Sequence, residues 1–263
     1  MPGLTGAGGP MFRLDGQAAI VTGASEGLGR MMAGGLAEAG CAVLLAARTE
    51  ERLEETAAAI RAGGGRVEVC PTDVTHPGSA ELLVDTCRER FGRLDGVVLN
   101  AGAAALCPAE SEDMDGFTHV MDVNLTAVMR LASHAATHMI GAGAGGWMIS
   151  MSSILGRRAG TGAGVAAYSA SKAAVEQLTR ELARQWAPHR IRVNCIAPGF
   201  FPTALNAPMV ADPQRLAAMI ARAPLGRHGE PADITGVAVF LASPAAAFVT
   251  GHVLACDGGM EVW

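Results

Sequence analysis

Short apolar segments alternate with helical segments through the first hundred residues, and this alternation restricts the fold more than any other feature. The apolar segments are residues 18–21, 41–47, 66–70 and 94–100. Each predicts a strand, and residues 18–21 and 41–47 are apolar throughout, as a buried strand is. The helical segments between them are residues 27–39, 50–62 and 79–91. Strands that alternate with helices form a parallel sheet covered on both faces, so the sequence predicts a doubly wound α/β fold.

The rest of the chain continues this alternation. Its predicted strands are residues 147–151, 192–197 and 249–255. Its predicted helices are residues 111–140, with Ser111 as N-cap, and residues 167–186, 212–223 and 231–242. Neither a linker nor a repeat follows residue 10. We therefore expect a flexible tail at residues 1–10 and one domain at residues 11–263, built on a seven-stranded, mostly parallel sheet.

Composition and charge restrict the class of partner. The net charge is −5 and the sequence has no basic block, which argues against nucleic-acid binding. No apolar run reaches the roughly 18 residues of a membrane span. The six cysteines are scattered without a Cys-x-x-Cys pair, which is typical of reduced thiols in a cytoplasmic protein. We expect a cytoplasmic protein that binds neither nucleic acid nor membranes.

Glycines occupy the turn between the first predicted strand and the first predicted helix. The turn reads Gly23-Ala-Ser-Glu-Gly27-Leu-Gly29. Glycines at such a turn let the backbone approach a pyrophosphate, and the helix N-terminus supplies N–H groups and a positive dipole end. Three residues separate the first two glycines, which is not the commonest dinucleotide fingerprint, and a turn without a ligand is the alternative. The position between strand and helix favours a nucleotide site.

The end of the second predicted strand bears on the choice between NAD and NADP. In dinucleotide-binding folds, an acidic residue about 20 residues past the glycines bonds the ribose of NAD, whereas a nearby arginine suits the 2′-phosphate of NADP. Here the strand ends Ala46-Ala47-Arg48, without an acidic residue. Glu26 is an opposing signal, because a carboxylate repels a 2′-phosphate, and a solvated Arg48 is the alternative. The pattern favours NADP(H) over NAD(H).

Tyr168 and Lys172 stand four residues apart in a predicted helix, so their side chains share one face. A neighbouring cation favours the phenolate, which predicts that the pKa of Tyr168 lies below its usual value of about 10. Such a phenol can give a proton to a carbonyl oxygen or take one from an alcohol. An ordinary helix face is the alternative. Tyr168 is the only tyrosine in the sequence, so any tyrosine chemistry takes place there.

Short motifs follow one another along the chain in a fixed order. They are Thr22-Gly23-x-x-x-Gly27-x-Gly29, Asp73-Val74, Asn100-Ala101-Gly102, Asn124, Ser153, Tyr168-x-x-x-Lys172 and Pro198-Gly199. In this order they resemble the motifs of the short-chain dehydrogenase/reductase family, most closely its 3-oxoacyl-carrier-protein reductase and its sugar or polyol dehydrogenase branches. The resemblance implies a Rossmann fold and NAD(P)(H)-dependent hydride transfer between a nicotinamide and a carbonyl or secondary alcohol. It also implies a homotetramer, with a dimer as the alternative.

The resemblance implies roles for individual residues. Tyr168 would be the general acid for carbonyl reduction and the base for alcohol oxidation, and Lys172 would lower its pKa and bond the nicotinamide ribose. Ser153 would hold the substrate oxygen, and Asn124 would anchor a water that relays protons to Lys172. The residues expected to bind the cofactor, besides Tyr168 and Lys172, are Gly23, Ser25, Gly27, Leu28 and Gly29 at the phosphates, Glu26 and Arg48 at the adenosine ribose, Asp73 and Val74 at the adenine, Asn100, Ala101 and Gly102 beside the adenosine, and Pro198, Gly199, Phe201 and Thr203 at the nicotinamide.

Two adjacent serines are candidates for the substrate-holding residue. We favour Ser153 over Ser152, because Ile154-Leu155-Gly156 follows it as in the family. The interval from Ser153 to Tyr168 is then two residues longer than the common spacing in the family. A glycine-rich loop at residues 154–166 would absorb the additional length.

The substrate wall is expected from residues 103–106, 154–165 and 200–219, which are largely apolar apart from Arg157 and Arg158. This favours NADPH-dependent reduction of an apolar or extended ketone such as a 3-oxoacyl group. An NAD-dependent dehydrogenase of a polyol, sugar or other secondary alcohol is the alternative within this class. An alternative of another class is a dinucleotide-binding sensor or scaffold without turnover.

Two histidines raise the question of a metal. His134 and His138 lie four residues apart in a predicted helix, as metal ligands on a helix do. No third ligand is evident, and the expected hydride transfer needs no metal. We therefore interpret the pair as part of a helix face or a subunit contact, and we expect no metal site.

Overall fold

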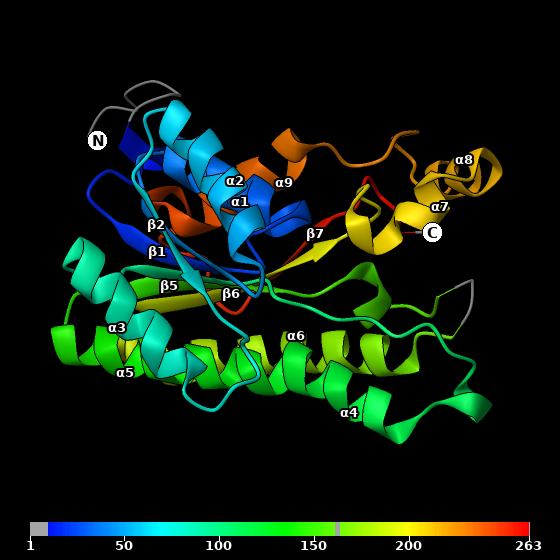
Figure 1. The fold of residues 1–263 in the computed structure, drawn as a ribbon, viewed down its shortest axis with the longest axis horizontal. Coiled ribbons are helices and arrows are strands. Elements are labelled where there is room, and N and C mark those ends of the chain that lie inside the picture. Colours follow the sequence, from blue (N-terminus) through cyan, green and yellow to red (C-terminus); the bar gives the residue numbers. More distant parts are fainter. Residues whose placement is uncertain (1–9, 161–163, 263) are drawn as a thin grey trace.

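The structure is a computed structural model that describes residues 10–160 and 164–262. Within these residues, seven strands form one sheet in the order β3-β2-β1-β4-β5-β6-β7 (Figure 1). The strands are β1 (Ala18–Thr22), β2 (Ala42–Ala47), β3 (Val67–Pro71), β4 (Gly96–Leu99), β5 (Gly146–Met151), β6 (Ile191–Pro198) and β7 (Val253–Cys256). Every pair of neighbouring strands is parallel, so the predicted parallel sheet is confirmed.

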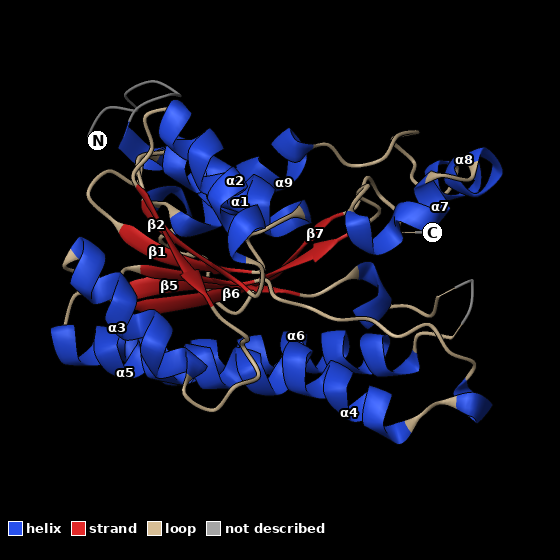
Figure 2. Ribbon diagram, in the orientation of Figure 1, coloured by secondary structure: helices blue, strands red, loops and turns tan. Residues whose placement is uncertain are grey.

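Helices cover both faces of the sheet (Figure 2). One face carries α1 (Gly27–Glu38), α2 (Glu50–Ala62) and α9 (Pro231–Ala242), and the other carries α3 (Ser79–Phe91), α5 (Ala127–Ala142) and α6 (Ala166–Trp186). Successive strand residues point to opposite faces. Accordingly, Val21 and Leu45 belong to the apolar cluster beneath α1, α2 and α9, whereas Ile20 and Leu44 belong to the cluster beneath the other three helices. The predicted doubly wound fold is confirmed.

Helices α1 and α9 pack against each other at a glycine. A β-carbon built on Gly35 would overlap the methyl group of Thr235. Gly34, the preceding residue, has nothing within 4 Å of such an atom. The close approach of the two helices therefore depends on the absence of a side chain at Gly35.

The segment predicted as one helix over residues 111–140 has a different start and an interruption. A 3₁₀ turn occupies Ala109–Ser111, and α4 (Met114–Met121) begins after Asp113, whose carboxylate accepts hydrogen bonds from the backbone N–H groups of Asp115 and Gly116. Asp113, and not Ser111, is therefore the N-cap, because Ser111 already completes the preceding turn. A π-helical turn at Asp122–Thr126 separates α4 from α5. Such turns occur mostly as single insertions in α-helices and often at functional sites.

Smaller differences concern the C-terminal third. The predicted strand at 249–255 is shorter and lies at Val253–Cys256, because Gly251 and Thr250 bond the backbone of Val193 ahead of it. In place of one helix over 212–223, the structure has α7 (Ala207–Val210) and α8 (Pro213–Ile220), with Asp212 as the N-cap of α8. The further 3₁₀ turns are Pro10–Phe12, Ile154–Gly156, Ala187–His189, Ala204–Asn206 and Pro244–Ala246. None of the helices in the described part of the chain is long and apolar enough to cross a membrane.

The strand order reverses between β1 and β4. From β1 the chain builds outward through β2 to β3, and it then returns to place β4 on the other side of β1. Two neighbouring strands whose connections leave in opposite directions leave a crevice beyond their carboxyl ends. In such folds this crevice is where a ligand binds. The turns after β1 and β4 are also where the glycine and Asn-Ala-Gly motifs lie.

Candidate active site

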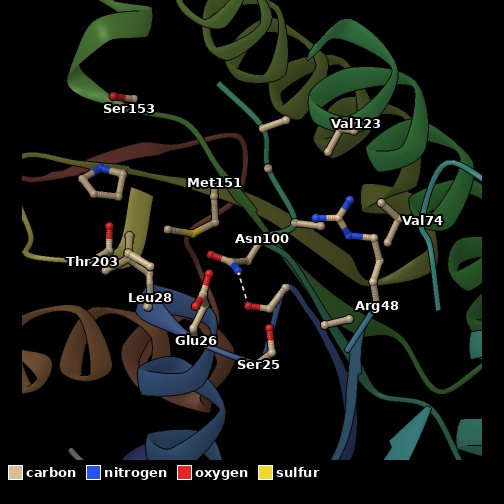
Figure 3. Close-up of a pocket in the computed structure, with 18 of the residues that line it drawn as sticks. Ser25, Glu26, Leu28, Arg48, Val74, Asn100, Val123, Met151, Ser153 and Thr203 are labelled. Atoms are coloured by element: carbon tan, nitrogen blue, oxygen red, sulfur yellow. Dashed lines mark hydrogen bonds between the residues drawn. The ribbon is translucent and has the colours of Figure 1, made fainter. Parts of the chain in front are cut away.

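A cavity of about 510 Å³ opens at the carboxyl ends of the strands, around the reversal in strand order (Figure 3). It brings together most of the residues predicted from the sequence. These are Gly23, Ser25, Glu26, Gly27, Leu28, Arg48, Asp73, Val74, Asn100, Ala101, Gly102, Ser153, Tyr168, Lys172, Pro198, Gly199, Phe201 and Thr203. Of the predicted set, Gly29 and Asn124 do not line the cavity.

The glycine turn is built by close backbone packing between β1 and β4. Gly23 and Gly27 have φ angles of 64° and 55°, in the left-handed region that favours glycine. Asn100 Nδ2 donates to the carbonyl oxygens of Thr22, at 2.9 Å, and Gly23, at 3.2 Å. The Asn100 side chain thus fastens the turn, as Figure 3 shows, and the neighbouring backbone faces the cavity. Gly29 has a packing role, because a β-carbon there would overlap the carbonyl oxygen of Gly23.

Charged residues gather at one end of the cavity. Arg48 follows β2 and lies near Asp73, which follows β3 (Figure 3 shows Arg48 beside Val74). Hydrogen bonds from the Thr75 side chain and backbone lower the pKa of Asp73, and the charge of Arg48 lowers it further. Glu26, the acidic residue in the glycine turn, forms a salt bridge of 2.8 Å with Arg52. The negative charge of Glu26 is therefore partly offset.

Tyr168 and Lys172 lie at the other end of the cavity, one helical turn apart on α6. Lys172 Nζ lies 5.5 Å from the centroid of the Tyr168 ring and donates a 2.8 Å hydrogen bond to the carbonyl oxygen of Met151. Only 4% of the Lys172 surface is exposed. Burial disfavours the ammonium and lowers the pKa of Lys172 to about 8.

The prediction that the pKa of Tyr168 lies below its usual value is wrong for the cofactor-free protein. Burial raises the pKa of Tyr168, although a hydrogen bond from Ser153 acts in the opposite direction. Removing a phenolate from water disfavours it, and here this effect exceeds the gain from the hydrogen bond. The predicted fall of the pKa in the complex with oxidised cofactor stays a prediction.

The two candidate serines have different surroundings. Ser153 Oγ accepts a 3.1 Å hydrogen bond from the backbone N–H of Leu155 and lies close enough to the Tyr168 phenol to lower its pKa. Ser152 Oγ lies 2.9 Å from the Glu176 carboxylate and 3.2 Å from the carbonyl oxygen of Lys172. Ser153, and not Ser152, is therefore the serine that lies close to the Tyr168 phenol. Residues 161–163 of the glycine-rich loop between Ser153 and Tyr168 lie outside the described residues.

Asn124 lies in the π-helical turn, behind the cavity wall, and is fully buried. Its Oδ1 accepts a 2.8 Å hydrogen bond from the Ala103 N–H, and its Nδ2 donates to the carbonyl oxygen of Ala103 at 2.9 Å. Nδ2 also lies 2.9 Å from Ser171 Oγ. Asn124 therefore ties the segment after β4 to α6. Its role in a water relay stays a prediction.

Several residues that line the cavity were not predicted from the sequence. They are Ala47, Thr49, Arg52, Thr72, His119, Val123 and Met151. Ala103, Ala204 and Asn206 also line the cavity but were expected only as part of the substrate wall, and Ser152 was the serine that the sequence did not favour. Within that wall, the Asn206 side chain bonds the backbone of Phe201 and Thr203 and fixes the loop after β6.

Comparison with known proteins gives a family and several relatives. A family model described as Enoyl-(Acyl carrier protein) reductase matches residues 23–261. Cis-4-hydroxycyclohexanecarboxylate dehydrogenase of Sinomonas cyclohexanicum is 42% identical over 242 residues, which cover 92% of this chain and 95% of that protein. A rhamnolipids biosynthesis 3-oxoacyl-(acyl-carrier-protein) reductase of Pseudomonas aeruginosa is 36% identical over 256 residues, 96% of this chain and 99% of that protein. The crystal structure of a putative NAD(P)-dependent gluconate 5-dehydrogenase from Beutenbergia cavernae, with bound NADP, matches with a TM-score of 0.89 and 42% identity, covering 97% of this chain and 100% of that chain.

The chain belongs to the short-chain dehydrogenase/reductase family. Its matches extend over nearly its whole length, and the parallel sheet is that of the family's solved structures. The expected reaction class is thereby confirmed: the protein is an NAD(P)-dependent oxidoreductase that acts on a CH–OH group or the corresponding carbonyl.

Proposed function

We propose that the protein is an NADPH-preferring ketone reductase that uses Tyr168 as its proton donor. The observation that carries this proposal is the arrangement of residues in this cavity. The glycine turn and Arg48 lie at one end of it, and Ser153, Tyr168 and Lys172 lie at the other. A dinucleotide that spans the cavity would bring its reactive ring to the phenol.

The residues present fit such a cofactor. Gly23 and Gly27 keep side chains away from the turn, and the N-terminus of α1 offers backbone N–H groups and a positive dipole end to a pyrophosphate. Asp73 and Val74 would hold the adenine, beside the backbone of Ala101. When bound, the nicotinamide supplies the hydride for reduction or accepts it for oxidation.

Tyr168, Ser153 and Lys172 would handle the proton. Ser153 Oγ, which lies close to the phenol, would hold the substrate carbonyl oxygen beside it. Tyr168 would give its Oη proton to that oxygen as the alcohol forms, and the same groups would act in reverse in oxidation. With a pKa of about 8, Lys172 is mostly protonated at pH 7, so its ammonium would stabilise the resulting phenolate. Asn124 would keep the wall at Ala103 in place.

The preference for NADP(H) rests on the charges at the other end of the cavity. Arg48 lies where the 2′-substituent of the adenosine ribose is expected, and β2 ends without an acidic residue. The opposing signal from Glu26 is weakened by its salt bridge with Arg52. The solved relative from Beutenbergia cavernae contains NADP, which supports the same preference.

A pair of arginine variants tests this preference. Arg48→Ala should weaken NADPH binding by about tenfold or more, because a hydrogen bond to a charged group contributes about 1.5–3 kcal/mol. NADH binding should change little. Arg61→Ala is the matched control, because Arg61 lies at the far end of α2, pairs with Glu54 and does not line the cavity. Equal weakening of both cofactors by Arg48→Ala would contradict the preference.

The walls around the reaction centre favour an apolar or extended ketone. Ile154, which follows Ser153, belongs to one apolar cluster with Phe200, Met209 and Met219. Arg157, one of the two cations in the expected wall, forms a salt bridge of 2.6 Å with Glu261. A polyol or hydroxy acid is the second candidate, favoured by the names of the cyclohexanecarboxylate and gluconate relatives. The Leu205 side chain, expected in this wall, lies outside the described residues.

Turnover with a small panel of ketones tests the function. We expect NADPH oxidation with a 3-oxoacyl thioester, and we would assay 5-ketogluconate and 4-oxocyclohexanecarboxylate beside it. Tyr168→Phe should lower kcat by about 10²–10⁴, the usual contribution of a positioned acid or base, while the cofactor still binds. Cofactor binding without turnover of any ketone would favour the sensor, and near-normal turnover of Tyr168→Phe would refute the assigned acid. We further propose that the protein is a cytoplasmic homotetramer, since the family resemblance implies that assembly.

A further inference from the structure

Glu176 is a buried carboxylate that the reaction described above does not use. It lies on α6, one turn after Lys172, and only 5% of its surface is exposed. Acidic side chains are almost never buried to this extent unless they are paired. Its partners therefore indicate what it does.

Glu176 contacts both sides of the turn that carries Ser153. Ser152 Oγ lies 2.9 Å from Glu176 Oε1. An ionised carboxylate only accepts hydrogen bonds, so the Ser152 hydroxyl must be the donor. On the far side of the turn, Arg157 Nε lies 3.6 Å from Glu176 Oε2, which Arg180 also approaches, at 3.5 Å. One carboxylate thus holds the residue before Ser153 and the residue after the 3₁₀ turn.

The same turn is pressed against α6 by backbone contact. A β-carbon built on Gly156 would lie 2.9 Å from the Ala173 nitrogen, the Lys172 carbonyl carbon and Ser152 Oγ. The turn Ile154–Gly156 therefore rests directly on the helix that carries Tyr168 and Lys172. With Glu176 attached to Ser152 and Arg157, little freedom remains for Ser153 to move relative to Tyr168.

We propose that Glu176 is a positioning residue, which sets the distance between Ser153 and Tyr168 through Ser152 and Arg157. This inference rests on the proposed role of Ser153. It assigns Glu176 no contact with the substrate or the cofactor. Displacing a reacting group by about 1 Å can cost about 10²-fold in rate, so a carboxylate that fixes this geometry matters for kcat without changing cofactor affinity.

Variants of Glu176 and Ser152 test the inference. Glu176→Ala should lower kcat by about 10- to 100-fold and leave the Kd of NADPH unchanged. Glu176→Gln should retain more activity, because its amide oxygen still accepts from Ser152. Ser152→Ala removes the donor alone and should lower kcat in the same sense, which keeps the test informative if Glu176→Ala does not fold. Glu181→Gln is the matched control, because Glu181 is an exposed glutamate on the same helix that pairs with Arg184.

The deciding measurement is a double-mutant cycle with Ser153→Ala. If Glu176 acts through Ser153, adding Glu176→Ala to Ser153→Ala should produce no further loss of kcat. If the fold-losses of kcat in the two single variants multiply in the double variant, the positioning role is overturned and the proposed function stays intact. A wild-type kcat in Glu176→Ala would also overturn the positioning role and leave the proposed function intact. Normal turnover of Ser153→Ala by itself would instead refute the proposed role of Ser153, and the positioning inference with it.

Discussion

Replacing Lys172 with methionine should abolish turnover and at the same time stabilise the cofactor-free protein. Lys172 carries its amino group in a site that is 4% exposed, with a hydrogen bond to the Met151 carbonyl oxygen. A buried ammonium loses its hydration, and the lowered pKa of Lys172 reflects this loss. Methionine has a similar length and no charge, so it removes the unfavourable burial together with the proposed catalytic group.

The size of the effect follows from the pKa. The pKa of Lys172 falls from 10.5 to about 8 on folding. At about 1.4 kcal/mol per pH unit, this difference corresponds to a destabilisation of about 3 kcal/mol at neutral pH. The variant leaves the Met151 carbonyl without its partner, which costs about 1 kcal/mol. We therefore expect a net gain of about 2 kcal/mol, or about 4–8 °C in Tm for a chain of this size.

The gain should depend on pH in a defined direction. Because the folded pKa lies below the unfolded value, the unfolded state binds more protons between about pH 8 and pH 10.5. Lys172 therefore destabilises the folded protein by the full amount below about pH 8. This destabilisation disappears as the pH rises to about 10.5. The advantage of Lys172→Met should accordingly be largest near pH 7 and should shrink towards pH 10.5.

Urea unfolding followed by tryptophan fluorescence, at pH 7 and pH 10 and at matched protein concentration, measures both effects. Matched concentration is needed because association of subunits contributes to apparent stability. Lys172 is the only lysine in the sequence, so isotope labelling of lysine gives a single side-chain signal whose titration reports the pKa. A Lys172→Met protein less stable than the wild type at pH 7, or an advantage that does not change with pH, would refute the reasoning.

Three further predictions follow from the same structure. Ultraviolet difference titration of Tyr168 should give a pKa above 10 in the cofactor-free protein and a lower value in the oxidised-cofactor complex; a pKa that cofactor does not move would contradict the proposed proton transfer. Gly35→Ala should destabilise the protein by about 1–3 kcal/mol in urea unfolding, because the added methyl group would overlap Thr235. Its matched control Gly34→Ala should be neutral or stabilising by up to about 1 kcal/mol. Similar values for both variants would mean that α1 and α9 separate easily. Sedimentation should give a tetramer at micromolar concentration, and a monomer would exclude the family-like assembly.

The fold could be predicted largely from local patterns. The runs that became β1 and β2 are short, apolar and bounded by glycine or polar residues, so their burial could be read directly from the sequence. The break between α4 and α5 could not be read in this way. It lies at Asn124, whose side chain bonds Ala103 and Ser171, residues distant in the sequence, and tertiary contacts of this kind override helix propensity.

The candidate site was predictable where its chemistry resides in contiguous motifs, as in the glycine turn and the Tyr168–Lys172 pair. Two properties required the three-dimensional structure. The pKa of Tyr168 depends on burial, which residue spacing does not reveal. Glu176 has the sequence context of any solvated helical glutamate, and only its contact with Ser152 distinguishes it. Spacing along the chain therefore indicated which residues meet, but not how strongly water is excluded from them.

The packing of α1 against α9 has a consequence for how the protein is made. Helix α1, whose N-terminus faces the cavity, ends at Glu38, and its partner α9 begins only at Pro231. At a synthesis rate of about 5–20 residues per second, the ribosome needs roughly 10–40 s to supply that partner. During this interval the buried face of α1, including Leu36, lacks part of its cover. The emerging chain would therefore depend on chaperones, and it would acquire affinity for nucleotide only late in synthesis.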